Sequence, residues 1–414
     1  MDNSKKLLVY AHYYYPDVAS TGQILKELCE GLSDKFEVTV ICTVPSYTGK
    51  ISDEYKYSKY YNENINGVNI IRVKVPEFEK GNKKSRIKNL IVYFFRAIWV
   101  TFKCGRQDYI FAISQPPILG GLLGSIGKII KRCKYIYNVQ DFNPEQTMVV
   151  GYAKNRLLLS FAMLLDKLSC RISDKVIVVG RDMQETLKSR FKNKRVPNNS
   201  FVNNWINEKE IYPLREDNEK VLAFKEKYNL IGKIVVMYSG NIGLYYDLEN
   251  IIKVIGRFKD RQDVVFAFVG DGSVKENIKK YAEENNMENV KFIPYQPKEE
   301  LIYSLNAGDI HWVVNAKGIK GISVPSKLYG VMAVGKTVFG VLEKGSEARL
   351  IIEEANCGIC VEPGNYEEIY LKLEKVINSI EDYNRLGMNG YKYLDNNIKK
   401  DFAIGKYIKE IIST

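Results

Sequence analysis

Short apolar runs alternate with longer amphipathic stretches along most of the chain. In the first half, these runs predict strands at residues 6–12, 37–42, 68–73, 109–114, 134–139 and 175–179. The pattern stops around residues 197–213 and then restarts, with strands expected at 234–238, 264–269, 290–293, 310–314, 336–341 and 358–361. Strands separated by helical stretches are typical of βαβ units and parallel sheets. We therefore expect an α/β protein with two doubly wound, Rossmann-like domains.

The chain length supports two domains, because 414 residues exceed the size at which one hydrophobic core stops growing. We expect an N-terminal domain over residues 1–205 and a C-terminal domain over 206–390. A final helical stretch, 391–414, is expected to pack back on the first domain. Ligands of open α/β sheets bind at the carboxyl ends of the strands. The site is therefore expected in a cleft between the two domains.

Composition indicates an ordinary globular protein, with 45% hydrophobic and 27% charged residues. No run of about 18 apolar residues predicts a membrane-spanning helix, and the N-terminus lacks the pattern of a secretory signal. We expect a cytoplasmic location, with which the seven irregularly spaced cysteines agree. Cys357 and Cys360 have the spacing of a redox pair, but we interpret them as two buried thiols in a strand.

The sequence offers little to bind a metal. It contains only two histidines, His12 and His311, and no Asp-x-Asp motif that could hold a metal on a diphosphate. We therefore expect neither a metal nor a cofactor.

Two glycine loops directly follow strands expected in the second domain. They are Tyr238–Gly243, with the sequence Tyr-Ser-Gly-Asn-Ile-Gly, and Gly270-Asp271-Gly272. Glycine lets the backbone approach a ligand and point its amides at anionic oxygens. The alternative is a simple tight turn. Neither loop is Gly-x-Gly-x-x-Gly, so a dinucleotide-binding dehydrogenase lacks its principal support.

The segment from Gly318 to Lys336 is the most informative. A loop rich in glycine, serine and proline opens a short helix, so residues 323–326, ending in Ser326, are expected to present amides to a phosphate. Lys327 lies in the first turn, which is a poor position for a cation unless an anion is nearby. The alternative is a solvated lysine.

Together these motifs resemble family 4 retaining glycosyltransferases of the GT-B fold, in particular bacterial colanic-acid and O-antigen fucosamine transferases. The resemblance extends over nearly the whole chain and depends on the order and spacing of individually weak motifs. Besides the loops above, the motifs are Tyr15-Pro16, Ser20-Thr21-Gly22, Pro45-Ser46-Tyr47, Asp141–Glu145, Asn204-Trp205, Phe268–Gly272, Ala307–His311, Gly345-Ser346-Glu347 and Cys357-Gly358.

The resemblance implies roles for matching residues. Gly240, Asn241 and Gly243 would line the diphosphate of a nucleotide-sugar donor, UDP-linked by preference, and Lys327 would neutralise it. Asp271 and Glu347 would lie near the nucleotide or the transferred sugar. Gly22 would lie near the diphosphate or the acceptor. Asp141 would lie beside the reacting sugar, although a helix cap or turn residue before Pro144 is the alternative.

Two departures from the family pattern concern donor binding. Leu244 stands where many members carry an arginine, and Ile322 and Gly330 stand where many carry two glutamates. The departure weakens the expectation for ribose binding and gives Lys327, helped by Lys320, more weight. The sequence offers no nucleophile, so we expect front-face substitution with retention, in which the leaving diphosphate takes the acceptor's proton.

The net charge of +12 could serve a nucleic acid, an anionic membrane or a phosphorylated substrate. Much of it lies in Lys80 to Arg106, where basic residues flank an apolar stretch. We interpret this segment as an interfacial helix on an anionic membrane, where a polyprenyl-diphosphate-linked saccharide would be the acceptor in capsule, O-antigen or exopolysaccharide synthesis. The alternative is a core helix with a solvated basic face.

Two other functions fit the sequence less well. A UDP-sugar 2-epimerase shares the fold but needs acidic and histidine acid–base groups in the cleft, and only His12 and His311 are available, His311 on an expected buried strand. Nucleic-acid binding is not expected, because the basic residues interleave with aliphatic runs and no recognised module is present.

Overall fold

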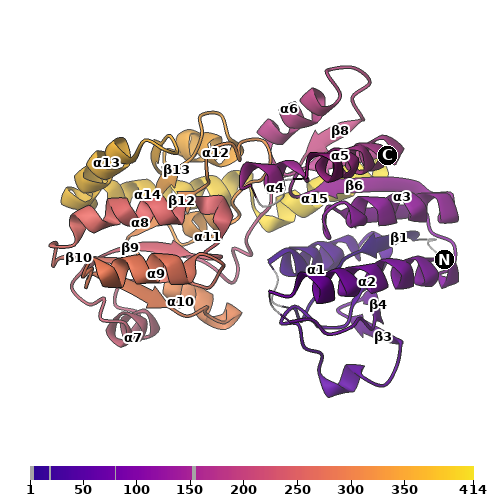
Figure 1. Cartoon of the computed structure of the whole chain (residues 1–414), viewed down its shortest axis with the longest axis horizontal. Coiled ribbons are helices and arrows are strands. Elements are labelled where there is room, and N and C mark those ends of the chain that lie inside the picture. The colour runs from indigo at the N-terminus through magenta and orange to yellow at the C-terminus, as the bar shows by residue number, and fades with distance from the viewer. Residues whose placement is uncertain (1–3, 18–19, 80, 152–154) are drawn as a thin grey trace. The chain divides into compact units, whose positions relative to one another are not determined.

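The chain folds into two compact α/β units (Figure 1). The structure, a computed structural model, describes residues 4–17, 20–79, 81–151 and 155–414. The first unit comprises Met1–Asn203 and Asp401–Thr414, and the second comprises Asn204–Lys400. The expected fold class, with two predominantly parallel sheets, is confirmed. The division between the units falls at residues 203–204, and the returning segment begins at Asp401.

The first unit is built on an eight-stranded sheet in the order β3-β4-β2-β1-β5-β6-β7-β8. The central strands form where apolar residues are continuous, because both faces of the sheet are covered. Its strands are β1 (Lys5–Tyr10), β2 (Phe36–Thr43), β3 (Tyr60–Ile65), β4 (Val68–Val73), β5 (Tyr109–Ile113), β6 (Lys134–Val139), β7 (Lys175–Val178) and β8 (Asn199–Phe201). The sequence pattern did not predict β3 or β8. Both lie at edges, where a strand needs no continuous apolar run, and β3 is antiparallel to β4.

Helices cover both faces of this sheet. They are α1 (Ser20–Leu32), α2 (Lys83–Lys103), α3 (Leu119–Lys131), α4 (Glu145–Val149), α5 (Arg156–Ile172), α6 (Arg181–Arg190) and α15 (Lys400–Ile412). The connections through α2, α3 and α5 all advance across the sheet in one direction, so right-handed crossovers place these helices on one face. The connection through α1 runs the other way, and α1 lies on the opposite face.

The C-terminal helix α15 shares the face of α1. Asn138 of β6 donates a hydrogen bond to the Tyr407 hydroxyl at 3.0 Å, and Lys175 of β7 forms an ion pair with Glu410. A Cβ atom at Gly31 of α1 would lie 2.7 Å from Ile404. The last helix therefore completes the core of the first unit.

The second unit has a six-stranded parallel sheet in the order β11-β10-β9-β12-β13-β14. All six strands occur where the sequence predicts them: β9 (Ile234–Ser239), β10 (Val264–Val269), β11 (Val290–Ile293), β12 (Ile310–Val314), β13 (Thr337–Val341) and β14 (Gly358–Val361). The helices are α7 (Glu219–Lys227), α8 (Leu248–Ile255), α9 (Lys275–Glu284), α10 (Leu301–Asn306), α11 (Lys327–Ala333), α12 (Glu347–Ala355), α13 (Tyr366–Asn378) and α14 (Ile380–Asn397).

Successive residues of β9 belong to two different apolar clusters. Val236 and Tyr238 pack in one cluster, whereas Val235 and Met237 pack in the other. This alternation follows from the pleat, which points successive side chains to opposite faces of a sheet. Tyr238 therefore lies on the same face of the sheet as Val236, and its hydroxyl contacts the loop that follows β9 from that face.

In the described part of the chain, no helix is both long and apolar enough to cross a membrane.

Candidate functional site

The two glycine loops of the second unit stack on one another at the carboxyl edge of its sheet. The Gly240 amide donates to the carbonyl of Val269 at 2.9 Å, and the Ile242 amide donates to the carbonyl of Asp271 at 2.8 Å. Gly270 has φ +138°, and a Cβ atom there would lie 2.1 Å from the Gly240 carbonyl oxygen. Only glycine permits this approach and this backbone conformation. The contact fixes Gly240, Asn241 and Asp271 in one edge structure.

Lys327 lies against this edge. Its Nζ atom donates a hydrogen bond of 2.6 Å to the Tyr238 hydroxyl, which in turn donates to the carbonyl of Asn241 at 2.6 Å. The same ammonium group lies 3.9 Å from the ring centre of Tyr238 and 3.8 Å from that of Tyr246. Its Cε atom lies 3.8 Å from the point that a Cβ atom on Gly240 would occupy. The structure thus brings together the predicted residues Gly240, Asn241 and Lys327.

The electrostatics of Lys327 are unusual for a lysine. Within the described ranges it forms no ion pair with a carboxylate, and its ammonium group is held by the two tyrosines instead. Burial lowers the pKa of Lys327 well below its usual value of 10.5. Burial also raises the pKa of Tyr238, and the neighbouring Tyr246 adds to this shift. A cation without an acidic partner gains most from an incoming anion, because no existing ion pair has to be broken.

Sequence reasoning missed Tyr238 and Tyr246. Tyr238 is the last but one residue of β9, and Tyr246 lies in a single turn of helix, Leu244–Tyr246. The one signal in the sequence was the tyrosine at the first position of the glycine loop. Lys275 was missed as well, although its Nζ donates to the Gly270 carbonyl at 2.9 Å and adds a second positive charge to the stacked loops.

Four other predicted residues of the second unit lie around this edge. Gly243 is in extended backbone, φ −117°, immediately before Leu244. Asp271 is exposed and accepts a hydrogen bond from the Gly272 amide at 2.9 Å. Ser326 is exposed at the start of α11 and makes no side-chain cap. Glu347 is buried at the start of α12, on the loop after β13.

The loop before α11 uses part of its own hydrogen-bonding capacity. The amides of Leu328 and Tyr329 donate to the carbonyls of Pro325 and Ser326, both at 3.2 Å. Lys320 donates to the Lys344 carbonyl at 2.7 Å, so its charge lies beside the loop that leads to Glu347. The position of Lys327 therefore distinguishes this site more clearly than the helix N-terminus does.

In the first unit, Asp141 follows β6 at the carboxyl edge of that sheet. Its backbone amide donates to Ser114 Oγ at 3.2 Å, and Gln146 Nε2 donates to its carboxylate at 3.2 Å. It does not cap α4, whose N-cap residue is Pro144 and whose first turn receives no side-chain cap. Gly22 is buried in α1, where an added Cβ atom would lie 3.2 Å from the Tyr13 carbonyl oxygen.

A largely buried ion network anchors the loop that carries Asp141. Arg190 of α6 pairs with Asp166 of α5 at 2.5 Å and with Glu145 of α4 at 2.5 Å. The same guanidinium donates to the Asn143 carbonyl at 3.0 Å and lies 4.1 Å from the Phe142 ring centre. One arginine thus connects three helices to the segment that carries Asp141, and nothing in the spacing along the chain predicted this contact.

The two histidines are both held in buried positions. His311 lies on β12, as expected, and its Nε2 atom is 3.0 Å from the Leu305 carbonyl. Burial lowers its pKa to about 3, and burial lowers the pKa of His12 to about 4. Since His311 is enclosed in the core of the second unit, it does not support the acid–base chemistry of an epimerase. The expectation of two buried thiols in a strand is met only in part: Cys357 is buried but precedes β14, and Cys360 lies in β14 but is half-buried. Burial raises the pKa of each thiol to about 12.

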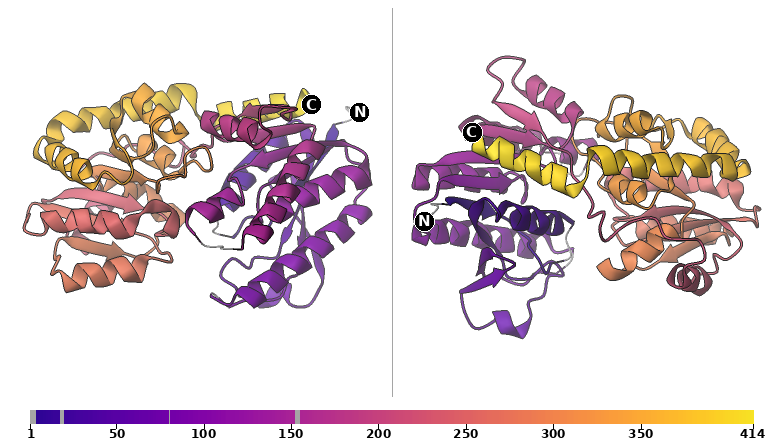
Figure 2. Two further views of the ribbon diagram at one scale, coloured as in Figure 1. Left: turned by 45° about the horizontal axis from the view of Figure 1, so that its top comes forward. Right: turned by 180° about the vertical axis from the view of Figure 1, so that it is seen from behind.

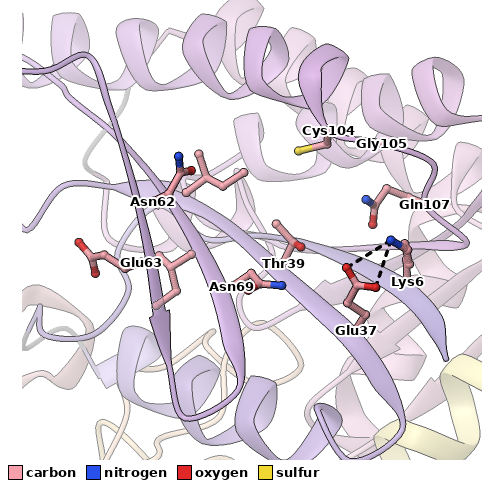
Figure 3. Close-up of a pocket in the computed structure, with 11 residues that line it drawn as sticks. Lys6, Glu37, Thr39, Asn62, Glu63, Asn69, Cys104, Gly105 and Gln107 are labelled. Carbon is pink, nitrogen blue, oxygen red and sulfur yellow. Dashed lines mark hydrogen bonds and ion pairs between the residues drawn. The ribbon is translucent and has the colours of Figure 1, made fainter.

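A cavity of about 330 Å³ opens on the first unit, but at the other edge of its sheet (Figure 3). Lys6, Glu37 and Asn69 line it, and each lies near the amino end of a parallel strand. None of the predicted site residues lines this cavity. Because ligands of open α/β sheets bind at carboxyl ends, the cavity is not the expected substrate site.

The solved structures place this architecture in a known class. Over 99% of this chain and 100% of the other, it superposes with a TM-score of 0.71 and 14% identity on HepE of Anabaena, whose crystal structure contains UDP and glucose. This chain, with its two α/β units, therefore has the GT-B glycosyltransferase fold.

The sequence comparisons agree with this class. Residues 215–393 match the family described as Glycosyl transferases group 1. A protein of Pseudomonas aeruginosa named glycosyltransferase WbjE is 29% identical over 68% of this chain and 70% of its own. A protein of Escherichia coli (strain K12), named colanic acid biosynthesis glycosyl transferase WcaI, is 23% identical over 98% of this chain and 99% of its own. The chain carries a group 1 glycosyltransferase domain in its second unit and is a glycosyltransferase.

Proposed function

We propose that this enzyme transfers a sugar from a UDP-sugar to a polyprenyl-diphosphate-linked saccharide during synthesis of a bacterial surface polysaccharide such as capsule, O-antigen or exopolysaccharide. The observation that carries the donor half is the Lys327 ammonium group, held by tyrosines beside the glycine loops. The name of WcaI, which refers to colanic acid, supports a polysaccharide product. UDP in the HepE structure supports the choice of nucleotide. The reaction takes place at the inner face of the cell membrane.

Lys327 acts on the leaving diphosphate. As the bond between the sugar C1 and the diphosphate oxygen breaks, negative charge grows on that oxygen, and a nearby ammonium group stabilises it. The acceptor hydroxyl attacks C1 from the same face, so configuration is retained, and its proton passes to the departing diphosphate. Lys327 supplies positive charge that a divalent cation could otherwise supply, and the proposed reaction therefore includes no metal.

The remaining predicted residues receive binding roles. Gly240, Asn241 and Gly243 line the diphosphate, and Ser326 lies beside it at the start of α11. Asp271 and Glu347 contact the nucleotide or the transferred sugar.

The first unit supplies the acceptor side. Asp141 orients sugar hydroxyls, and Gly22 lies near the diphosphate or the acceptor.

A melting-temperature panel tests the donor half. UDP-glucose, UDP-N-acetylglucosamine, GDP-mannose and ADP-glucose are added separately to the purified protein. A ligand that binds only the native state raises the melting temperature, and we expect this from the UDP-sugars alone. A response to GDP- or ADP-sugars instead would replace UDP as the donor nucleotide, and a response to none would contradict the proposed donor site.

A further inference from the structure

The layer formed by α2, α3 and α5 covers one face of the first sheet. Helix α3 lies between the other two and contacts both, and Figure 2 shows these purple helices side by side. Each connects two parallel strands, so each runs antiparallel to the strands from the carboxyl edge to the amino edge. The first turns of α2 and α5 therefore lie toward the edge at which Asp141 follows β6.

The outward side of α2 is lined with large apolar side chains. Its inward side already packs on the sheet through Tyr93, Ala97 and Val100. The outward residues are between 49% and 65% exposed and recur every three or four positions, which places them on one stripe: Ile87, Ile91, Phe95, Trp99 and Phe102. Packing in the core explains the apolar residues on the inward side of α2, but it does not explain the outward stripe.

Helix α5 carries a second outward stripe, which the sequence pattern did not predict. Its inward side includes the buried residues Asp166, Ser169 and Cys170. Its outward residues are between 45% and 84% exposed: Leu157, Leu158, Phe161, Leu164 and Leu168. On α3, between the two stripes, Ile129 is 67% exposed. Soluble monomers rarely expose so many large apolar side chains on adjacent helices.

The charges of this layer have a single sign. Helix α2 contains Lys83, Lys84, Arg86, Lys88, Arg96 and Lys103, and no acidic residue. Helix α3 adds Lys131, whereas its Lys128 is already paired with Asp174, and α5 adds Arg156, Lys167 and Arg171. The only acidic residue in the three helices, Asp166, is 2% exposed and is paired with Arg190. The outward surface therefore combines apolar side chains with positive charge.

We propose that α2 and α5 together form one docking face for a bilayer that contains anionic lipids. The apolar stripes enter the boundary between headgroups and acyl chains, and the lysine and arginine side chains reach the lipid phosphates. A second copy of the chain is a poorer occupant, because two uniformly basic faces repel each other.

This docking face deepens the proposed function, because a lipid-linked acceptor has to be met at a membrane. It goes beyond the segment 80–106 expected from the sequence, of which Lys80 lies outside the described residues. Since both helices begin toward the carboxyl edge, docking through their outward stripes would bring the bilayer toward the edge that carries Asp141.

Vesicle flotation tests the docking face without any substrate. Wild-type protein is floated with phosphatidylcholine vesicles that do or do not contain phosphatidylglycerol, and we expect binding only to the anionic vesicles. The triple variant Leu158→Asn, Phe161→Asn and Leu164→Asn removes the three central residues of the α5 stripe, and we expect the partition coefficient to fall at least about tenfold. The quadruple variant Lys83→Glu, Lys84→Glu, Arg86→Glu and Lys88→Glu should lose binding as well.

A matched control uses apolar side chains that are exposed on α15, on the other face of the same unit. Phe402 and Ile412 are 47% and 52% exposed, and Phe402→Asn with Ile412→Asn should leave partitioning unchanged. Circular dichroism and the melting temperature establish that each variant is folded.

The outcomes separate this proposal from the proposed function. If the α5 variant floats like wild type, the two-helix face is wrong, even if the α2 variant loses binding. Binding of wild type to neither vesicle, or a wild-type dimer in solution that the α5 variant converts to monomer, would also overturn it. A failure of the UDP-sugar panel with flotation intact would instead remove the donor assignment and leave the docking face standing.

Discussion

The two units fix the loops at their carboxyl edges by different means. In the first unit, the Asp141 loop is tied to three helices through the side chain of Arg190, which is buried among Asp166, Glu145 and Phe142. In the second unit, the donor loops are fixed by backbone contact between Gly240 and Gly270, and the nearby Lys327 has no acidic partner within the described ranges. A loop fixed by an ion network keeps its charges paired, whereas a loop fixed by glycines leaves a cation available for a ligand.

Replacing Arg190 should have the largest effect. Arg190→Met leaves the buried Asp166 and the nearby Glu145 without their cation, and loss of one partner of a buried pair costs about 3–5 kcal/mol. The free energy of unfolding of the first unit can be measured from the urea dependence of hydrogen exchange in β6 and β7. Lys188→Met is the control, because Lys188 lies on the same helix as Arg190 and pairs with Glu185 at the surface. There we expect about 0–1 kcal/mol, and equal losses in the two variants would contradict the role of the network.

The two glycines of the second unit offer a matched pair. Both have a left-handed φ near the same value, +135° at Gly240 and +138° at Gly270, so alanine should cost about 1–3 kcal/mol in strain at either. At Gly270 the new Cβ atom also collides with the Gly240 carbonyl, which should add about 1 kcal/mol. A Cβ atom at Gly240 would have no neighbour closer than Lys327 Cε, at 3.8 Å. Urea midpoints of the second unit should therefore fall further for Gly270→Ala, and the reverse order would show that the stacked loops do not fix each other.

These contacts mark the limit of what the sequence predicts. The six strands of the second sheet follow from short apolar runs, two of which lead into glycine loops, and Lys327 was predicted because a cation is unusual in the first turn of a helix. The stacking of Gly240 on Gly270 is a contact between residues 30 positions apart, and the Arg190 network joins residues from three helices. Such contacts depend on tertiary packing, which spacing along the chain does not encode. The α5 stripe was missed for the same reason, because apolar residues on a helix reveal only after packing which of them remain outside.

Removing the Lys327 cation should impair catalysis without impairing the fold. Lys327→Ala is expected to lower turnover about 10²-fold or more, by analogy with the loss of one donor to a developing oxyanion. Turnover is measured as UDP release with the UDP-sugar that the melting panel identifies. Lys317→Ala is the control, since Lys317 is an exposed lysine ten residues earlier in the chain. Full activity in Lys327→Ala would remove this residue from the mechanism.

The smallest expected effect concerns pH and tests whether the unpaired cation of the second unit behaves differently from a paired one. Burial lowers the pKa of Lys327 in the donor-free protein, and a bound diphosphate should raise it again by favouring the charged form. Between those two pKa values, binding requires uptake of a proton, so UDP-glucose affinity should fall as pH rises, by up to about tenfold per pH unit.

The free energy of unfolding should rise with pH in the window below 10.5, because there the unfolded chain holds the lysine proton more tightly. Titration calorimetry in buffers of different ionisation enthalpy measures the uptake directly. Lys327→Arg should abolish both trends, because arginine stays protonated, and an unchanged pH dependence in that variant would assign the titration to another group.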